Sequence, residues 1–184
     1  MTEKEKMMAG EIYDANYDDQ LCRERLAAQD LCHDYNLLRP SDLEGRRALI
    51  DRLGIKHGAN CIIQQPFICD YGYNISVGDN FFANSNFIVL DGARVSIGSN
   101  VFIAPNVGIY TAGHPLDAEQ RNKGLEYARP VTIGDNVWIG AGVHILPGVT
   151  IGDNCVIGAG SIVNKDIPPH HLAAGNPCRP IKKI

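Results

Sequence analysis

The 184-residue sequence contains no apolar run that approaches the roughly 20 residues needed by a membrane-spanning helix. Its first 14 residues, MTEKEKMMAGEIYD, include charged residues and lack an apolar core, so we expect no secretory signal. Basic residues are outnumbered, with 17 Lys and Arg against 21 Asp and Glu, for a net charge of −4. This balance disfavours a nucleic-acid binder. Together these absences favour a cytoplasmic protein without membrane or nucleic-acid partners.

Metal-binding signatures are also missing. The six cysteines form no CxxC pair, and neither the cysteines nor the histidines show a ligand spacing typical of zinc sites. The sequence therefore favours reduced thiols and predicts no metal.

The sequence does contain a strict period of six between Val131 and Asn164. The repeated aliphatic positions are Ile133, Ile139, Ile145, Ile151, Ile157 and Val163. A period of six fits neither a helix nor an alternating strand. It fits a solenoid of short strands joined by tight corners, in which each repeat buries its apolar residue against the next coil.

The solenoid is expected over residues 57–168, where roughly five turns of about 18 residues each can be placed. Two extra residues between Val89 and Ile97, near Asp91-Gly92, indicate a bulge or turn. Residues 169–184 are expected to form a C-terminal tail, because prolines end the array.

Residues 1–56 have a helical composition instead. One helix is predicted from about Asp19 to Asn36, and Ser41 with Glu44 predicts a capping box at the start of a second helix that Gly54 can end. This segment could cover the open end of the solenoid or lend residues to a substrate site, and the sequence leaves both roles open.

The period stops over residues 110–130, which carry six charged side chains. Such an excursion from a regular solenoid is uncommon unless it is functional or disordered. His114 lies in it between Gly113 and Pro115 and is a candidate general base. Taken alone, an exposed loop histidine is more often ordinary polar surface.

Three further residues have both a structural and a functional interpretation. Asp70, set among tyrosines, fits a sugar site or an ordinary turn; Asn84 fits a side-chain ladder or a ligand contact. Trp138 falls at an outward-facing position, which is typical of an interface or a ligand platform. The basic C-terminal residues fit a solvated tail or a grip on ligand phosphates. They are Lys165, Arg179, Lys182 and Lys183.

The hexapeptide array, NFFAN at 80–84, TAGHP at 111–115, TIGDNVWIG at 132–140 and AAGNPCRPIKK at 173–183 together resemble the maltose and galactoside O-acetyltransferases. The resemblance covers nearly the whole chain, including the helical opening segment. It implies a mainly β protein, a left-handed parallel β-helix that works as a homotrimer with active sites between subunits. It also implies transfer of acetyl from acetyl-coenzyme A to a sugar hydroxyl.

The same resemblance assigns roles to particular residues. His114 matches the catalytic base, Asp70 an acceptor-binding residue, and Asn84 a residue near both acetyl group and acceptor. Trp138 matches a tryptophan that borders the cleft. Coenzyme contacts are implied at Ala141, Ala159, Lys165, Arg179 and Lys182, and we expect an oxyanion donor at a backbone N–H near Ala141.

Gly92 stands where the galactoside enzymes have a second acceptor carboxylate, although Asp91 is adjacent. Together with DYGYN at 70–74 and the IKK ending, this departure favours maltose or glucose over galactosides as acceptor. The acidic acceptor-binding residue of the N-terminal segment is not assignable among Asp14, Asn16 and Asp18. The alternatives are a galactoside or another hydroxyl or amine acceptor, and a non-catalytic hexapeptide scaffold. A hexapeptide carbonic anhydrase would need three histidines spaced across the coils, which His114 and His144 do not supply.

Overall fold

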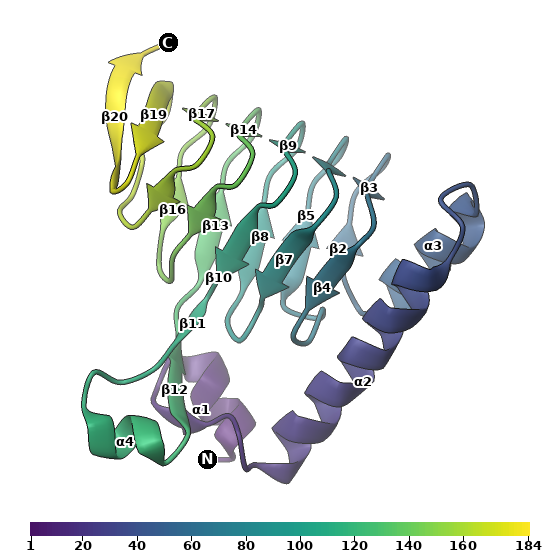
Figure 1. Ribbon diagram of the computed structural model, residues 1–184, viewed down its shortest axis with the longest axis vertical. Coiled ribbons are helices and arrows are strands. Elements are labelled where there is room, and N and C mark those ends of the chain that lie inside the picture. Colours follow the sequence, from purple (N-terminus) through teal and green to yellow (C-terminus); the bar gives the residue numbers. More distant parts are fainter.

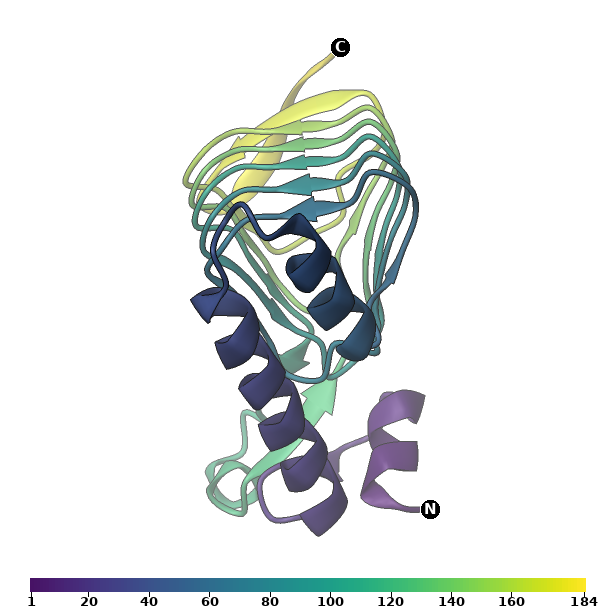
Figure 2. The ribbon, with the colours of Figure 1, turned by 90° about the vertical axis from the view of Figure 1, so that its right-hand side faces the viewer.

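The chain forms a parallel β-helix with helices at one end and a hairpin at the other (Figure 1). We describe it from a computed structural model of residues 1–184. Three sheets form its walls, parallel throughout except for the last strand of the second, and Figure 2 shows the coils stacked behind one another. The solenoid predicted from the six-residue period is confirmed.

The first wall contains β2 (Lys56–His57), β5 (Ile75–Val77), β8 (Val95–Ile97), β13 (Val131–Ile133) and β16 (Thr150–Ile151). The second wall contains β3 (Ile62–Ile63), β6 (Phe82–Ala83), β9 (Phe102–Ile103), β14 (Trp138–Ile139), β17 (Val156–Ile157), β19 (His171–Gly175) and β20 (Cys178–Lys183). The third wall contains β4 (Phe67–Cys69), β7 (Phe87–Leu90), β10 (Gly108–Tyr110), β15 (His144–Ile145) and β18 (Ile162–Val163).

The six-residue repeat fills the core because each short strand turns one side chain inward. Ile139 pairs in register with Ile103 and Ile157, and all three are buried. Adjacent strand residues point to opposite faces, so Trp138 points outward and is 57% exposed. The inward residues of the coils join buried residues of the N-terminal helices in one cluster of 36 buried residues.

Asparagines form one stacked corner of the helix. They adopt the left-handed backbone conformation, which asparagine tolerates better than most residues. These are Asn60, Asn80, Asn100, Asn136 and Asn154. Their amides bond from coil to coil, for example from Asn100 Nδ2 to Asn136 Oδ1 at 3.2 Å. Asn84 is not part of this ladder, because its Oδ1 accepts from the backbone N–H of Ser85.

The coils are not all of the expected length. Ser76 pairs with Ser96, which makes an early coil 20 residues long, whereas Thr132 pairs with Thr150, which makes a later one 18. The extra residues lie at the corner between the third and first walls, after β4 and after β7. The excursion after β10 leaves from the same corner. Three successive coils therefore depart from the repeat at one corner. The first departure, at residues 70–74, was not predicted from the sequence.

The N-terminal segment contains α1 (Glu3–Ala9), β1 (Tyr13–Asp14), α2 (Asp19–Leu37) and α3 (Leu43–Arg52). The helix expected from about Asp19 is confirmed as α2. The capping box at Ser41 is wrong: Asp42 is the N-cap of α3, and its carboxylate accepts from the N–H of Gly45 at 2.9 Å. No helix in the structure combines the length and the apolar character that a membrane crossing requires.

Helices α2 and α3 cover the first coil (Figure 2). The Tyr35 hydroxyl and the Arg46 guanidinium both donate to the carbonyl of Ile63 on β3. Asn36 bonds both the N–H and the carbonyl of Phe67 on β4, at 2.8 and 2.9 Å. These side chains satisfy backbone groups that an open solenoid end would leave unpaired.

At the other end, residues expected to form a tail extend the second wall instead. Strand β19 pairs in parallel with β17, and β20 folds back on β19 in antiparallel orientation. The hairpin forms because the last coil otherwise exposes a row of unpaired backbone groups. All six cysteines are free thiols.

The excursion is an ordered structure. It contains β11 (Ala112–Gly113), α4 (Ala118–Asn122) and β12 (Leu125–Ala128). Strand β12 pairs in antiparallel orientation with both β11 and β1, so the excursion and the N-terminal segment share a small sheet. Figure 1 shows this sheet beside α1, below the coils.

Candidate active site

A cavity of about 350 Å³ lies where the small sheet meets the corner of the irregular coils. The N-terminal segment and α2, the first two corners and the excursion all contribute side chains to it. Its lining residues are Tyr13, Asn16, Arg25, Asp70, Tyr71, Leu90, Ala112, Gly113, His114 and Glu126. Two of the predicted site residues, His114 and Asp70, therefore meet in one cavity although 44 positions separate them in the sequence.

His114 is held with one ring nitrogen free. Its Nδ1 lies 2.9 Å from the carbonyl oxygen of Leu125, and a carbonyl can only accept, so Nδ1 carries the proton. In the neutral ring the lone pair is then on Nε2. The side chain is 47% exposed, and Nε2 lies 3.9 Å from Glu126 Oε1, too far for a hydrogen bond. The histidine can therefore accept a proton from a group that enters the cavity.

Asp70 follows β4 and faces the same cavity. Burial raises the pKa of its carboxyl to about 6, with a further contribution from Asp91, and the Arg25 guanidinium opposes the shift. Asp91 is fully buried below it, where its Oδ1 accepts from the backbone N–H groups of Asp70 and Tyr71 at 3.1 and 2.9 Å. Asp91 thus fixes the loop that carries Asp70.

One of the three N-terminal candidates lines the cavity. Asp14 accepts from the N–H groups of Asn16 and Tyr17, and Asp18 is the N-cap of α2, so local turns occupy both carboxylates. Asn16 lines the cavity, and its Nδ2 donates to the carbonyl of Gly124 at 2.8 Å. Of the three candidates, only Asn16 faces the site.

Four further residues line the cavity and were not predicted from the sequence: Glu126, Tyr13, Arg25 and Tyr71. Glu126 Oε2 accepts from the Tyr13 hydroxyl at 3.2 Å, across the β1–β12 pair. Arg25 donates to the Tyr71 hydroxyl at 3.2 Å. The cluster of tyrosines at 71 and 73 was a usable signal, whereas nothing in the sequence distinguishes Glu126 from the other charged residues of the excursion.

The remaining predicted residues lie elsewhere on the molecule. Asn84, Ala141 and Ala159 lie at the corner between the second and third walls, and the N–H of Gly160, next to Ala159, donates to the carbonyl of Ala141 at 2.8 Å. Trp138 lies on the outer face of the second wall, in register with Phe102 and Val156. Lys165, Arg179 and Lys182 lie near the last coil and its hairpin, all exposed. None of these residues lines the His114 cavity, so a single chain does not bring the two sets together.

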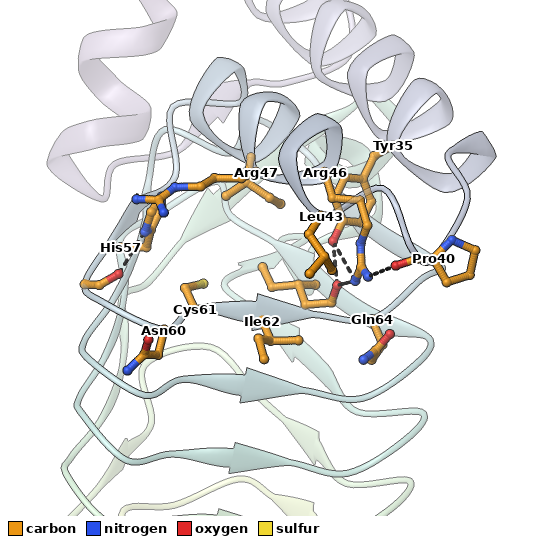
Figure 3. A pocket seen from close by; sticks show the side chains of 13 residues that line it. Tyr35, Pro40, Leu43, Arg46, Arg47, His57, Asn60, Cys61, Ile62 and Gln64 are labelled. Atoms are coloured by element: carbon orange, nitrogen blue, oxygen red, sulfur yellow. Dashed lines mark hydrogen bonds between the residues drawn. The ribbon is translucent and has the colours of Figure 1, made fainter.

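A second cavity, of about 460 Å³, lies between α3 and the outer face of β3 (Figure 3). It contains His57, but both ring nitrogens of that residue are used, by the Gly58 carbonyl and by Asp51, each at 2.9 Å. Arg46 donates to the carbonyls of Pro40 and Ile63 there. With no free base, this cavity is a poorer candidate for proton-transfer chemistry.

Comparison with known proteins agrees with this geometry. Residues 6–53 match the family described as the maltose acetyltransferase hexapeptide capping motif, and residues 130–165 match the bacterial transferase hexapeptide. A Saccharomyces cerevisiae protein assigned by name to the acetyltransferases, YJL218W, is 59% identical over 98% of this chain and 92% of its own length.

Solved structures extend the match to the whole fold. A maltose O-acetyltransferase from Clostridium difficile is 56% identical, with a TM-score of 0.97 over 100% of this chain and 98% of its own. A galactoside acetyltransferase in complex with coenzyme A is 46% identical, with a TM-score of 0.95 over 100% of this chain and 92% of its own. The expected fold class, a left-handed parallel β-helix, is thereby confirmed. The chain is an acyltransferase and belongs to the hexapeptide-repeat acetyltransferases that include the maltose and galactoside enzymes.

Proposed function

We propose that the protein transfers acetyl from acetyl-coenzyme A to a hydroxyl of a sugar such as maltose or glucose. The observation that carries this proposal is His114, whose Nδ1–H donates to Leu125 and whose unprotonated Nε2 faces a cavity lined with hydroxyls and carboxylates. The similarity to a maltose O-acetyltransferase supports the acceptor, and the coenzyme A complex of the galactoside enzyme supports the donor.

In the proposed reaction, Nε2 of His114 takes the proton of the acceptor hydroxyl as its oxygen attacks the thioester carbonyl. The resulting tetrahedral intermediate collapses with cleavage of the C–S bond. The imidazolium then returns the proton to the departing coenzyme A sulfur, so the products are the acetyl ester and free coenzyme A. The Leu125 carbonyl fixes the Nδ1–H tautomer of the neutral imidazole and keeps the ring oriented while Nε2 gains and loses the proton.

Asp70 is the proposed acceptor-binding carboxylate, because it lines the same cavity as His114. Its carboxylate oxygens can accept from sugar hydroxyls. The half-buried Leu90 side chain, which also lines the cavity, offers apolar surface to the carbon face of a sugar.

The donor residues are proposed to act across a subunit boundary. Asn84 and Trp138, with the corner at Ala141 and Ala159, lie away from the His114 cavity of their own chain. A homotrimer with sites between neighbouring subunits would supply these residues from a second copy. The exposed cations Lys165, Arg179 and Lys182 would then contact the phosphates of the coenzyme, and a backbone N–H near Ala141 would stabilise the oxyanion.

The test is release of coenzyme A from acetyl-coenzyme A with maltose or glucose as acceptor. His114→Ala is expected to lower kcat by about 10²- to 10⁴-fold with an unchanged circular dichroism spectrum. His33→Ala, on the exposed face of α2, is the matched control and should retain full activity. Full activity of the His114 variant would refute the assignment of the base. Sedimentation velocity measures the proposed trimer, and a monomeric active enzyme would refute the shared site.

A galactoside or amine acceptor is the second candidate, since the galactoside acetyltransferase is also similar over the whole chain. A panel of glucosides, galactosides and amino sugars separates these acceptors by kcat/KM. A scaffold without catalytic function would bind no acetyl-coenzyme A in calorimetry.

A further inference from the structure

One carboxylate oxygen of Glu126 accepts a hydrogen bond within the protein, and the other lies near Nε2 of His114. Its Oε2 accepts from the Tyr13 hydroxyl at 3.2 Å, and its Oε1 lies 3.9 Å from His114 Nε2. The side chain is 20% exposed, which leaves Oε1 accessible from the cavity.

The backbone fixes this arrangement. Glu126 lies opposite Tyr13 in the β1–β12 pair, and the turn before it is held by the bond from Asn16 Nδ2 to the Gly124 carbonyl at 2.8 Å. A shift of one residue in this register would turn the Glu126 side chain to the other face of the small sheet. The carboxylate is therefore positioned by tertiary pairing rather than by a flexible loop.

Nε2 of His114 and Oε1 of Glu126 both present lone pairs to the cavity. Two acceptors do not bond each other when the imidazole is neutral, but each can take a separate O–H donor. Because the two atoms are 3.9 Å apart, two donors that bind them at the same time lie close together, and one acceptor molecule can supply both. Hydroxyls on adjacent or next-adjacent carbons of a sugar satisfy this condition.

We infer that Glu126 is a specificity-determining residue that binds a second hydroxyl of the acceptor, next to the one that His114 deprotonates. The inference rests on the proposed function and narrows its acceptor to molecules that contain a 1,2- or 1,3-diol. The Glu126 carboxylate also faces the imidazolium that forms during attack, which stabilises that charge.

The experiment compares glucose with its monodeoxy analogues, after the acetylated position has been identified by NMR of the product. In the wild type, one analogue that lacks a hydroxyl near that position should lose about 10- to 100-fold in kcat/KM, the expected effect of a hydrogen bond to a charged group. In Glu126→Ala, glucose should lose this advantage, so that the ratio of kcat/KM for glucose to kcat/KM for that analogue falls to near one. In Glu126→Gln the side-chain amide can still bond the Tyr13 hydroxyl and can form an uncharged hydrogen bond with the substrate hydroxyl. This variant should therefore give an intermediate kcat/KM ratio of about 2- to 10-fold.

Glu119→Gln is the matched control, because it removes an exposed carboxylate from the same excursion, where Glu119 pairs only with Lys123. It should keep the wild-type ratio. If Glu126→Ala lowers kcat/KM equally for glucose and every analogue, Glu126 acts only on the structure of the site and the inference is overturned. A wild type that acetylates sugars without discriminating any analogue overturns the inference alone, whereas a wild type inactive on every sugar overturns the proposed function with it.

Discussion

Replacing Asp70 with asparagine should stabilise the protein and weaken acceptor binding. Burial and the nearby Asp91 raise the pKa of the Asp70 carboxyl from 3.8 to about 6. In the unfolded chain the ordinary value applies. Between about pH 4 and pH 6 the folded state therefore retains a proton that the unfolded state has released, and stability falls as the pH rises.

The magnitude follows from the size of this difference. At about 1.4 kcal/mol per pH unit, a pKa raised from 3.8 to about 6 corresponds to about 3 kcal/mol of lost stability above pH 6. Asparagine has a similar shape and does not titrate. We expect Asp70→Asn to increase the free energy of unfolding by up to about 3 kcal/mol at pH 7.5, and the gain to disappear below about pH 4.

Urea unfolding at pH 4, 5, 6 and 7.5 measures this difference, and kcat/KM for the acceptor at pH 7.5 measures the loss of function. Asp30→Asn, on the exposed face of α2, is the control and should change neither quantity. If the stabilities of Asp70→Asn and the wild type differ by the same amount at every pH, the carboxyl is not perturbed by burial and the reasoning fails. If the acceptor kcat/KM is unchanged, Asp70 does not bind the acceptor.

Two further predictions test the solenoid and the excursion. Asn100 bonds Asn80 and Asn136 and has a φ of 56°. Because glycine adopts this conformation without strain, Asn100→Ala should be about 1 kcal/mol less stable than Asn100→Gly in urea unfolding. Equal stability of the two variants would show that the corner does not require a left-handed backbone conformation. Replacing residues 116–128 with a short turn should abolish coenzyme A release, because it removes both Glu126 and the carbonyl that orients His114, while the thermal unfolding of the coils remains cooperative. Retained activity would show that the array alone forms the site.

The position of His114, the proposed base, was predictable from the sequence, but its tautomer was not. The break in the six-residue period marks His114 as part of a non-repeating segment. The proton on Nδ1 depends on the Leu125 carbonyl, which reaches the ring only because the excursion folds into β11, α4 and β12. No local pattern predicts that fold, because the excursion obtains its register from pairing with β1, more than 100 residues earlier in the chain.

The folded chain also separates residues that were predicted to share one site. Resemblance placed Asn84 and His114 in one site, whereas the folded chain places them at different corners. A repeat specifies which side chains point outward on each coil, but the sequence alone does not show which corner meets which other surface. That depends on packing between distant elements and, in the proposed trimer, between chains.

The walls of this protein follow directly from the repeat in its sequence. Each hexapeptide buries its aliphatic residue against similar residues in the next coil, so the fold is encoded in a local pattern that can be counted. The composition of the cavity, in contrast, depends on long-range contacts in the folded chain. Tyr13, Asp70 and Glu126 are brought together by a strand pair and by corners of unequal length, and these arise from contacts between segments far apart in the chain.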